Sequence, residues 1–365
     1  MADETPNLLL IDDNPESLES LRQRLAVLMP AEEVEIRTWV PTEEDGPPAE
    51  AFEARVDDQT ALVITDYDLT TSVKGLFGLS IVGWCQKKAI PVGDFSRGNV
   101  ANLPKEPNLF ELRVPTDDEH GAAFVATTFR GFRSLRSGIE EAPALLTERR
   151  SLAAVLSSLL GRSRLESQFA AYMSRLGASN SALLQQLRSF AGEDQPDDAD
   201  KIRLLTYVLG HVLCNAILKY PGPILSRHSL CAYMATTLGE SEAIEPLFAD
   251  ARYTGPFSAG HSYFWRGDVD RILDGFGGDL DQADLESFAD LNRRLVEEAL
   301  GRPLATHDCD RCGGVKGGFW CPFTVRPVCE RADCSVPSSS WIPSGAQLCR
   351  VERDFYDEWA PLLGL

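Results

Sequence analysis

Apolar and polar positions follow two different periods in the first third of the chain. Short, wholly apolar runs, typical of strands buried on both faces of a parallel sheet, are separated by segments with helical spacing. The first of those segments begins at Asn14-Pro15 and places leucines at 18, 21, 25 and 28 on one face. The pattern predicts strands at 7–11, 33–39, 61–65, 90–95 and 109–114, and helices at 15–28 and 78–88. This alternation favours a doubly wound α/β domain with a parallel sheet.

From residue 118 the pattern changes to long helical periodicity. Helical segments are predicted at 119–139, 142–160, 163–191, 200–218 and 281–300. An acidic run around Pro196 and the sequence Tyr220-Pro221-Gly222-Pro223 interrupt them, because proline cannot continue a helix. The acidic, proline-rich residues 41–50 are expected to form an exposed loop.

Past residue 301 the chain becomes rich in cysteine, glycine, proline and tryptophan. Such a segment builds few regular elements and is expected to need a metal ion, or docking onto the helices, to fold. We therefore predict three parts: an α/β domain at 1–117, a helical domain at 118–300 and a cysteine-rich module at 301–365.

The composition argues against two functional classes, nucleic-acid-binding proteins and membrane proteins. The 365 residues carry a formal net charge of −20, which repels nucleic-acid phosphate over most of the surface. Apolar stretches stay below the roughly 18 to 20 residues that span a bilayer, and the N-terminal residues are acidic rather than signal-like. A cytoplasmic protein without a membrane partner is expected, and the sequence leaves its oligomeric state open.

Acidic residues follow two of the predicted strands. Asp12 and Asp13 come directly after the strand at 7–11, and Asp66 follows the strand at 61–65. The carboxyl ends of parallel strands meet at one edge of a sheet, so three carboxylates converging there could hold a hard cation such as Mg²⁺. An alternative is that they cap helices, Asp13 especially, since it precedes Asn14-Pro15.

These residues carry a resemblance to a known family. The segments LLLIDDNPESLESLRQRL, VITDYDL and IPVGDFS occur in the order of the receiver domain of two-component response regulators, which residues 7 to about 116 resemble. The resemblance implies that Asp66 accepts a phosphoryl group from a partner histidine kinase. It implies Mg²⁺ ligands from Asp12, Asp13, Asp66 and the backbone carbonyl of Asp68, and a hydrogen bond from Ser96 to the phosphoryl group. Beyond phosphorylation of its own Asp66, no enzymatic activity is expected.

One family residue is missing. The family carries a lysine before a proline at the end of its fifth strand, whereas this chain reads FELRVP, with Val114 before Pro115. Arg113 is one residue out of register and would point to the opposite face of a strand, and Lys105 could reach back as a substitute. This departure leaves a second hypothesis open, a phosphorylation-independent adaptor that uses the receiver fold only for docking.

A third hypothesis is a DNA-binding regulator. Residues 225–248 have the small-residue rhythm of a helix-turn-helix with Gly239 in the turn. Glu240, Glu242 and Glu245 fall where a recognition helix would approach phosphate, which makes nucleic acid an unfavourable partner. His211, on an apolar helix, is expected to be buried and bonded to the backbone rather than to bind a ligand.

Six of the nine cysteines lie in the last part of the chain. Cys309 and Cys312, followed by Gly313, have the spacing of a zinc half-site, since a tight turn directs both thiolates at one tetrahedral centre. The predicted partners are Cys321 and Cys329, with Cys334 and His307 as alternates. Four thiolates leave no coordination position for water, so this Zn²⁺ would be structural. The remaining cysteines are expected to be small buried hydrophobes: Cys85, Cys214, Cys231 and Cys349.

Overall fold

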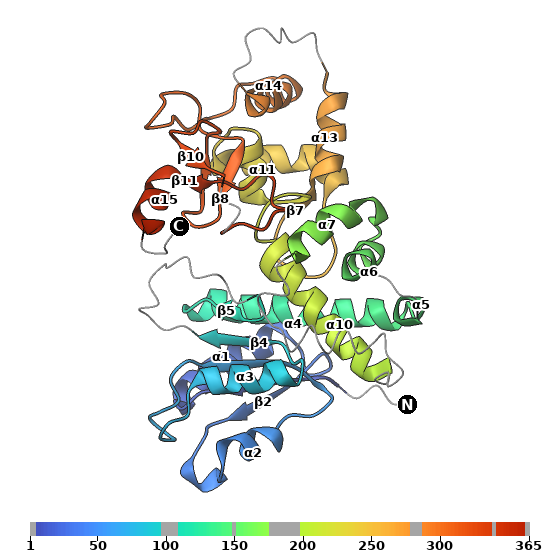
Figure 1. Ribbon diagram of the computed structural model, residues 1–365, viewed down its shortest axis with the longest axis vertical. Coiled ribbons are helices and arrows are strands. Elements are labelled where there is room, and N and C mark those ends of the chain that lie inside the picture. Colours follow the sequence, from blue (N-terminus) through green and yellow to red (C-terminus); the bar gives the residue numbers. More distant parts are fainter. Residues whose placement is uncertain are drawn as a thin grey trace.

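The protein places a parallel sheet at one end and the cysteine-rich module towards the other, with helices between them (Figure 1). The computed structural model describes residues 5–95, 109–147, 151–174, 198–277, 287–337 and 341–361. Within these ranges the helices are too short or too polar to cross a lipid bilayer.

Five parallel strands form the sheet, in the order β2-β1-β3-β4-β5. They are β1 (Asn7–Ile11), β2 (Glu35–Trp39), β3 (Thr60–Asp66), β4 (Val92–Phe95) and β5 (Leu112–Val114). This is one of the common orders of doubly wound sheets, in which the direction of winding reverses between β1 and β3. The predicted α/β class with additional helices and a C-terminal cysteine cluster is confirmed at this level.

Helices cover both faces of the sheet. Leu8, Leu10 and Ile64 share a core with α1 (Pro15–Leu28) and α4 (Asp118–Glu140). Leu9, Ile11 and Val63 face the opposite way, towards α2 (Pro48–Glu53) and α3 (Gly78–Lys87). Alternate residues of one buried strand thus enter two different cores, which explains why these strands are apolar throughout.

Part of the loop expected at 41–50 is instead regular. Residues Glu43–Asp45 form a 3₁₀ turn, and α2 begins at Pro48, where the fixed backbone angle of proline suits the first helical position. Helix α2 then buries Phe52, which packs against Trp84 of α3. The acidic composition hid this short helix because its apolar residues come only at its end.

Helix α4 ties the sheet to the rest of the chain. Arg130 donates hydrogen bonds to the Glu33 carboxylate at 2.7 Å and to the Leu28 carbonyl at 2.7 Å, and Arg133 donates to the Glu33 carbonyl at 2.9 Å. These arginines attach α4 to the loop after α1. The predicted division after residue 117 therefore falls just before a helix that packs on the sheet.

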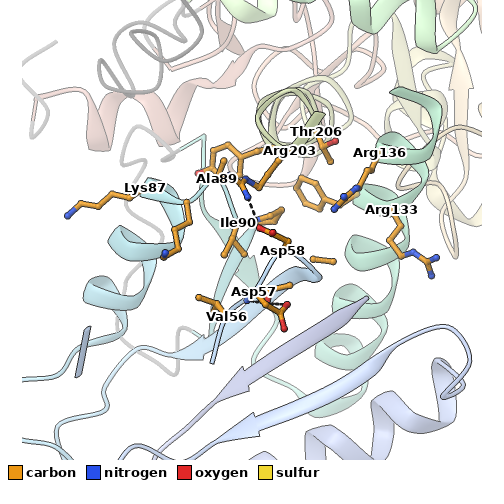
Figure 2. A pocket seen from close by; sticks show the side chains of 16 residues that line it. Val56, Asp57, Asp58, Lys87, Ala89, Ile90, Arg133, Arg136, Arg203 and Thr206 are labelled. Carbon is orange, nitrogen blue, oxygen red and sulfur yellow. Dashed lines mark hydrogen bonds and ion pairs between the residues drawn. The ribbon is translucent and has the colours of Figure 1, made fainter. Parts of the chain in front are cut away.

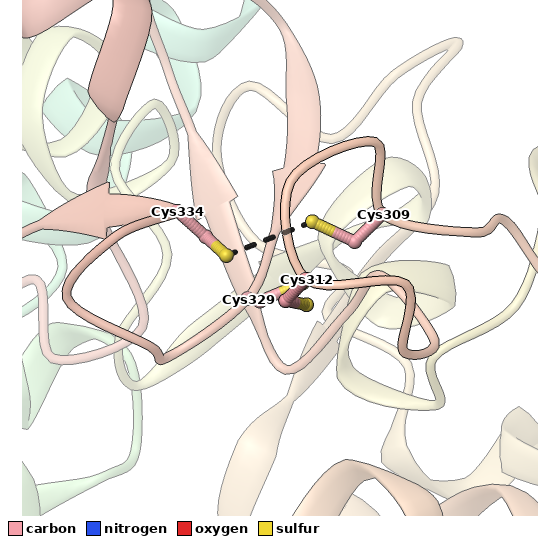
Figure 3. A group of neighbouring side chains, drawn as sticks. All are labelled: Cys309, Cys312, Cys329 and Cys334. Carbon is pink, nitrogen blue, oxygen red and sulfur yellow. Dashed lines mark hydrogen bonds between the residues drawn. The ribbon is translucent and has the colours of Figure 1, made fainter.

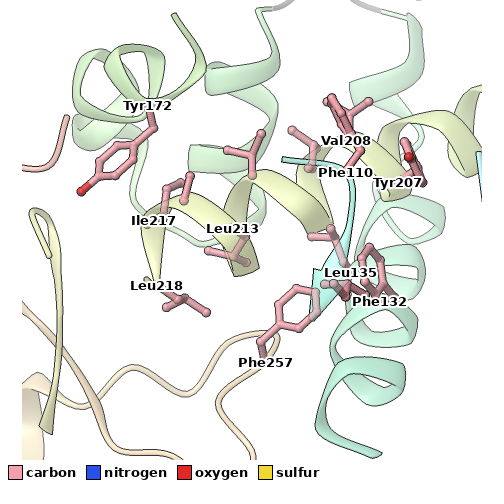
Figure 4. Close-up of a cluster of buried hydrophobic side chains, with 14 of the residues drawn as sticks. Phe110, Phe132, Leu135, Tyr172, Tyr207, Val208, Leu213, Ile217, Leu218 and Phe257 are labelled. Carbon is pink, nitrogen blue, oxygen red and sulfur yellow. The ribbon is translucent and has the colours of Figure 1, made fainter. Parts of the chain in front are cut away.

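Helix α10 (Asp198–Val212) crosses α4 and continues as a π-helical turn (Leu213–Ile217). Its aromatic residue Tyr207 stacks on Phe110, with ring centroids 5.4 Å apart, and Phe132 of α4 lies in the same cluster (Figure 4). His211 is fully buried and its Nδ1 lies 2.8 Å from the Tyr207 carbonyl, as predicted. Burial lowers the pKa of His211 to about 4, so its ring is neutral at pH 7.

Shorter elements complete the helical part. They are α5 (Ala144–Thr147), α6 (Leu152–Leu159), α7 (Glu166–Met173), α11 (Arg227–Tyr233), α12 (Ser241–Ile244), α13 (Arg266–Gly275), α14 (Phe288–Leu300) and the antiparallel pair β6 (Ile224–Ser226) and β7 (Tyr263–Trp265). Two predicted helices lie partly outside the described residues. These are the helix at 163–191, beyond residue 174, and the start of the helix at 281–300.

The segment at 225–248 does not form the helix-turn-helix that the third hypothesis requires. After α11 it continues as a 3₁₀ turn (Leu238–Glu240), the four-residue α12 and a second 3₁₀ segment that begins at Glu245. Two of its acids are engaged, Glu240 with Arg302 at 2.7 Å and Glu245 with Arg227. Pro246 at the start of the last segment explains why no longer recognition helix forms.

The C-terminal module is built from two small hairpins and a helix. These are β8 (Phe319–Cys321) with β9 (Arg326–Val328), β10 (Ser335–Val336) with β11 (Val351–Glu352), and α15 (Arg353–Trp359). The module docks on the helices, as expected for a segment with a small core. The Gly318 amide donates to the Ala232 carbonyl at 2.7 Å, and a Cβ at Gly345 would lie 2.2 Å from the Tyr172 ring.

Glycine substitutions at the α4–α10 crossing and in α3 are expected to change the free energy of unfolding in opposite directions. A Cβ at Gly210 would lie 2.2 Å from the buried Phe132 ring, whereas a Cβ at Gly83 in α3 would meet nothing within 4 Å. We expect Gly210→Ala to lower the free energy of unfolding by about 2 kcal/mol through overpacking. Gly83→Ala should raise it by about 0.5–1 kcal/mol through helix propensity. Urea denaturation of both variants checks this, and equal signs would contradict the close packing.

Candidate functional site

Three acidic side chains meet at the carboxyl edge of the sheet. Strands β1 and β3 are paired in parallel, with Ile11 opposite Thr65, so the residues that follow them emerge side by side. The carboxylate oxygens of Asp12, Asp13 and Asp66 all lie within 4.8 Å of one another. The convergence predicted from the sequence is therefore present, and a group with this spacing could hold a cation.

Asp13 belongs to the acidic cluster and does not cap the helix that follows it. Asn14 caps α1, since its side chain accepts hydrogen bonds from the amides of Glu16 at 2.9 Å and Ser17 at 3.2 Å. The alternative that Asp13 caps this helix is wrong. Within the described part of the chain, Asp13 Oδ2 is buried and has no hydrogen-bond partner. A buried carboxylate oxygen without a donor is costly, and a bound cation would satisfy it.

Asp12 is held rigidly beside it. The side chain is 7% exposed and its Oδ1 accepts a hydrogen bond from the Asn14 amide at 2.8 Å. A cavity of about 20 Å³, lined by Asp12, Phe95 and Thr116 among others, lies next to this carboxylate. That volume suits one water molecule or ion.

The chain turns back tightly after Asp66. A Cβ at position 78 would lie 2.3 Å from the Asp66 carbonyl, so only glycine fits, and the Gly78 amide donates to the Tyr67 carbonyl at 2.9 Å. The exposed Asp68 carboxylate accepts hydrogen bonds from the Thr70 hydroxyl and amide, at 2.6 and 3.0 Å, which lower the pKa of Asp68. Its side chain lies outside the group of three, an arrangement compatible with a role for its backbone carbonyl alone.

Three further predicted residues remain: Ser96, Lys105 and Arg113. Ser96 and Lys105 lie outside the described residues. Arg113 is exposed in the middle of β5 while its neighbours Leu112 and Val114 enter the core, so it faces the opposite side of the sheet, as expected. Val114, which stands where the resemblance implies a lysine, is buried.

A buried acid that was not predicted from the sequence lies next to this edge. Asp94 in β4 is 6% exposed, and its Oδ1 has no hydrogen-bond partner among the described residues. Burial raises the pKa of Asp94 to about 6, Glu111 adds to the rise and Arg113 opposes it. An aspartate inside the otherwise apolar run VGDF was the signal in the sequence.

Four cysteine thiols form a second candidate site (Figure 3). The sulfur atoms of Cys309, Cys312, Cys329 and Cys334 all lie within 4.8 Å of one another, and Cys309 Sγ is 3.7 Å from Cys334 Sγ. Three of the four side chains are buried, and every cysteine of the chain is a free thiol. Such a group could bind a metal ion such as zinc.

Two tight turns direct these thiols inwards. The Gly313 amide donates to the Cys309 carbonyl at 2.8 Å, and Gly313 has φ = 67°, a conformation that favours glycine. On the other side Cys329 follows β9 and Cys334 precedes β10, with the Cys334 amide bonded to the Arg331 carbonyl at 2.9 Å. Each turn supplies two ligands from a short loop.

The thiols strongly influence one another. Although burial opposes ionisation, backbone hydrogen bonds from Cys312 and Arg311 lower the pKa of Cys309 to about 7. Burial and the neighbouring sulfurs raise the pKa of Cys334 to about 12 and also raise that of Cys329. Four thiolates cannot coexist here without a positive charge between them, which is the condition a metal ion meets.

The predicted ligand set needs one correction. Cys321 is fully buried in the core, where its sulfur accepts a hydrogen bond from the Glu352 amide at 3.4 Å, and it does not belong to the cluster. Its place is taken by the alternate Cys334, while the other alternate, His307, is exposed and outside the group. Cys321 lies within β8, where the strand directs it into the core.

Comparison with protein-family models and with curated proteins finds no match to this chain.

Asp94 predicts a pH-dependent difference in stability. Because its pKa is about 6 in the folded protein and 3.8 when unperturbed, its favourable contribution is fully present below pH 3.8 and is lost as the pH rises through 6. We expect Asp94→Asn to be more stable than the wild type by about 2 kcal/mol above pH 6, with the difference vanishing near pH 4. Thermal denaturation in Mg²⁺-free buffer from pH 4 to 8 measures it, and a pH-independent difference would contradict the shift.

Proposed function

We propose that this protein is a receiver-like signalling protein in which Asp66 accepts a phosphoryl group. The observation that carries the proposal is the gathering of Asp12, Asp13 and Asp66 at the carboxyl edge of the parallel sheet. Two further observations support it: the strand order is the one that receiver domains share with flavodoxin-like folds, and Asp13 Oδ2 is buried without a partner.

The proposed chemistry is the transfer of a phosphoryl group from a histidine nitrogen to a carboxylate oxygen. An oxygen of Asp66 forms a bond to phosphorus while the phosphorus–nitrogen bond of a phosphohistidine breaks, and the released imidazole keeps the electron pair and takes up a proton. The nucleophile and the phosphoryl group are both anionic, so Asp12 and Asp13 would hold Mg²⁺ to neutralise that charge. The donor would be a partner histidine kinase, and Ser96 would bond to the phosphoryl group afterwards, as the family resemblance implies.

A second candidate is an adaptor that binds partners without phosphorylation. The specific observation in its favour is Val114, which is buried where the family carries its lysine, while Arg113 faces away from the acidic cluster. Without that ammonium group, a phosphoryl group on Asp66 would lack one of its usual charge partners. The two candidates differ in whether Asp66 responds to phosphoryl chemistry.

Phosphoryl mimicry distinguishes them. With Mg²⁺ and beryllofluoride, the wild-type protein should gain about 2.7 kcal/mol of stability when the mimic is present at 100 times its Kd, and its melting temperature should rise by several degrees. Incubation with a small acyl phosphate and Mg²⁺ should add the mass of one phosphoryl group. Differential scanning fluorimetry and intact-mass spectrometry make the two measurements.

Two variants serve as controls. Asp66→Asn should abolish both responses because it removes the nucleophile. Asp68→Asn should keep them, since its carboxylate is bonded to Thr70 outside the group of three. If the wild type behaves like Asp66→Asn, phosphorylation is excluded and the adaptor function stands.

We also propose that Cys309, Cys312, Cys329 and Cys334 bind one structural Zn²⁺. The support is the enclosure of four thiols by two short turns, which would supply all four tetrahedral ligands and leave no position for water. Because this module docks on α11, the proposed role of the metal is to stabilise the module and its contact with the helices rather than to perform chemistry.

Cysteine substitutions test the proposed ligand set. Purified wild-type protein should contain about one equivalent of zinc, Cys334→Ser should lose most of it, and Cys321→Ser should keep it because Cys321 lies outside the cluster. Metal analysis by mass spectrometry gives the content. Less than about half an equivalent in the wild type, or equal loss in both variants, would refute the assignment.

A further inference from the structure

A cavity of about 410 Å³ lies at the opposite edge of the sheet from the acidic cluster (Figure 2). It opens between the start of β3, the loop from α3 to β4, and helices α4 and α10. Thr60, at the cavity, and Asp66, at the acidic cluster, are the two ends of the same strand. The cavity is therefore a separate place, and neither proposed activity uses it.

The floor of the cavity is apolar. It is lined by Ala89, Ile90, Pro91, Phe132 and Tyr207, all of them buried. Cavities of this volume with a mostly apolar lining are typical of small-molecule sites. Such a lining favours a ligand with an apolar body.

A buried hydroxyl in the lining has no partner. Thr206 of α10 is 7% exposed, and its Oγ1 makes no hydrogen bond within the described part of the chain. An unsatisfied buried hydroxyl costs stability unless something else bonds to it. A polar atom of a bound molecule would supply that bond.

The mouth of the cavity is basic, although the whole protein is strongly acidic. Five cationic side chains line it against two acids: Lys87, Lys88, Arg133, Arg136 and Arg203 against Asp57 and Asp58. Figure 2 shows Arg136 and Arg203 extending towards the space between α4 and α10, while Lys87 and Arg133 extend outwards. Two arginines from facing helices form a clamp suited to an anion.

The existing ion pairs leave this clamp available. Arg136 bonds to Glu140 at 2.9 Å one helical turn away, with both side chains about 40% exposed, and such pairs are weak in water. Arg203 bonds to Asp58 at 3.1 Å and also to Asp200 on the same helix, and the two carboxylate side chains are 90% and 48% exposed. Asp57 is engaged by Arg37 at 2.6 Å, away from the clamp. An incoming phosphate could exchange for these exposed contacts.

We infer that this cavity binds a small organic phosphate with an apolar body, of the size of a purine mononucleotide. The apolar body would lie on the floor of the cavity, with one of its polar atoms bonded to the Thr206 hydroxyl. The phosphate would lie at the mouth between Arg136 and Arg203, because guanidinium groups pair with phosphate through two parallel hydrogen bonds.

Calorimetric titration of AMP into the full-length protein tests the inference. AMP should bind at least about tenfold more tightly than either adenosine or inorganic phosphate, because only AMP uses both the floor and the clamp. Its affinity should fall as the salt concentration rises. Arg136→Gln combined with Arg203→Gln should weaken AMP at least about tenfold and leave adenosine unchanged.

Thr206→Val provides a sharper variant. It has nearly the same shape and removes only the unpaired hydroxyl, so AMP affinity should fall about fivefold while the melting temperature stays level or rises. The matched control combines Arg164→Gln with Arg326→Gln, which removes two exposed arginines remote from the cavity and should bind AMP like the wild type.

Several outcomes would overturn the inference. Absence of AMP binding at millimolar concentration would do so, as would AMP binding no tighter than phosphate. An equal loss in the control double variant would indicate general electrostatic attraction, and a loss in Asp66→Asn would place the nucleotide at the acidic cluster instead. A melting temperature lowered by Thr206→Val would assign the hydroxyl to structure rather than to a ligand.

Discussion

The parallel pairing of β1 with β3 is the constraint on which the rest of the molecule depends. Both strands are buried on both faces, and their register places Ile11 opposite Thr65. A slip of one residue would exchange the side chains that face the two helix layers, which the apolar cores do not permit. The acids that follow each strand consequently emerge together, and the starts of β3 and β4 border the cavity at the other edge.

Helix α4 extends this order to the remainder of the chain. One side of it packs on the sheet. On this side Arg130 and Arg133 also bond to the loop after α1. Another side meets α10, where Gly210 allows the Phe132 ring to approach the helix backbone closely. The same helix therefore contributes to the α/β core, to the helical core and to the basic mouth of the cavity. The sheet and the helices are therefore in continuous packed contact through α4.

The chemistry of the molecule is divided among places that differ in charge. Carboxylates gather at the edge where the strands end, arginines and lysines gather at the edge where they begin, and thiols gather in a module docked on the helices. Each group would attract a different partner: a hard cation, an anion and a soft metal ion. The acidic cluster and the cavity share strand β3 but lie at its two ends, whereas the thiols belong to a separate module.

Local patterns in the sequence determined the five strands of the parallel sheet, its covering helices at 15–28 and 78–88, and the identity of the acids, whereas the short strands after residue 218 and the helices α2, α13 and α15 were not predicted. The run at 7–11 and the helix at 15–28 lie where their periodicity and capping residues indicated, because strand alternation, helical spacing and proline act over a few residues. The same reasoning identified the turn at Cys309 and Cys312, whose spacing alone directs two thiols to one point.

Only the tertiary structure decided which residues from distant segments lie in the same site. Only the packed chain shows that Cys334 joins the thiol cluster while Cys321 enters the core, since the choice depends on how the strands of the C-terminal module fold together. It also decided that Asn14 rather than Asp13 caps α1, that Asp94 is buried, and that arginines from α4 and α10 face one cavity. Spacing along a chain specifies neighbours within a turn or a strand, whereas contacts across tens of residues are settled by which apolar surfaces cover one another.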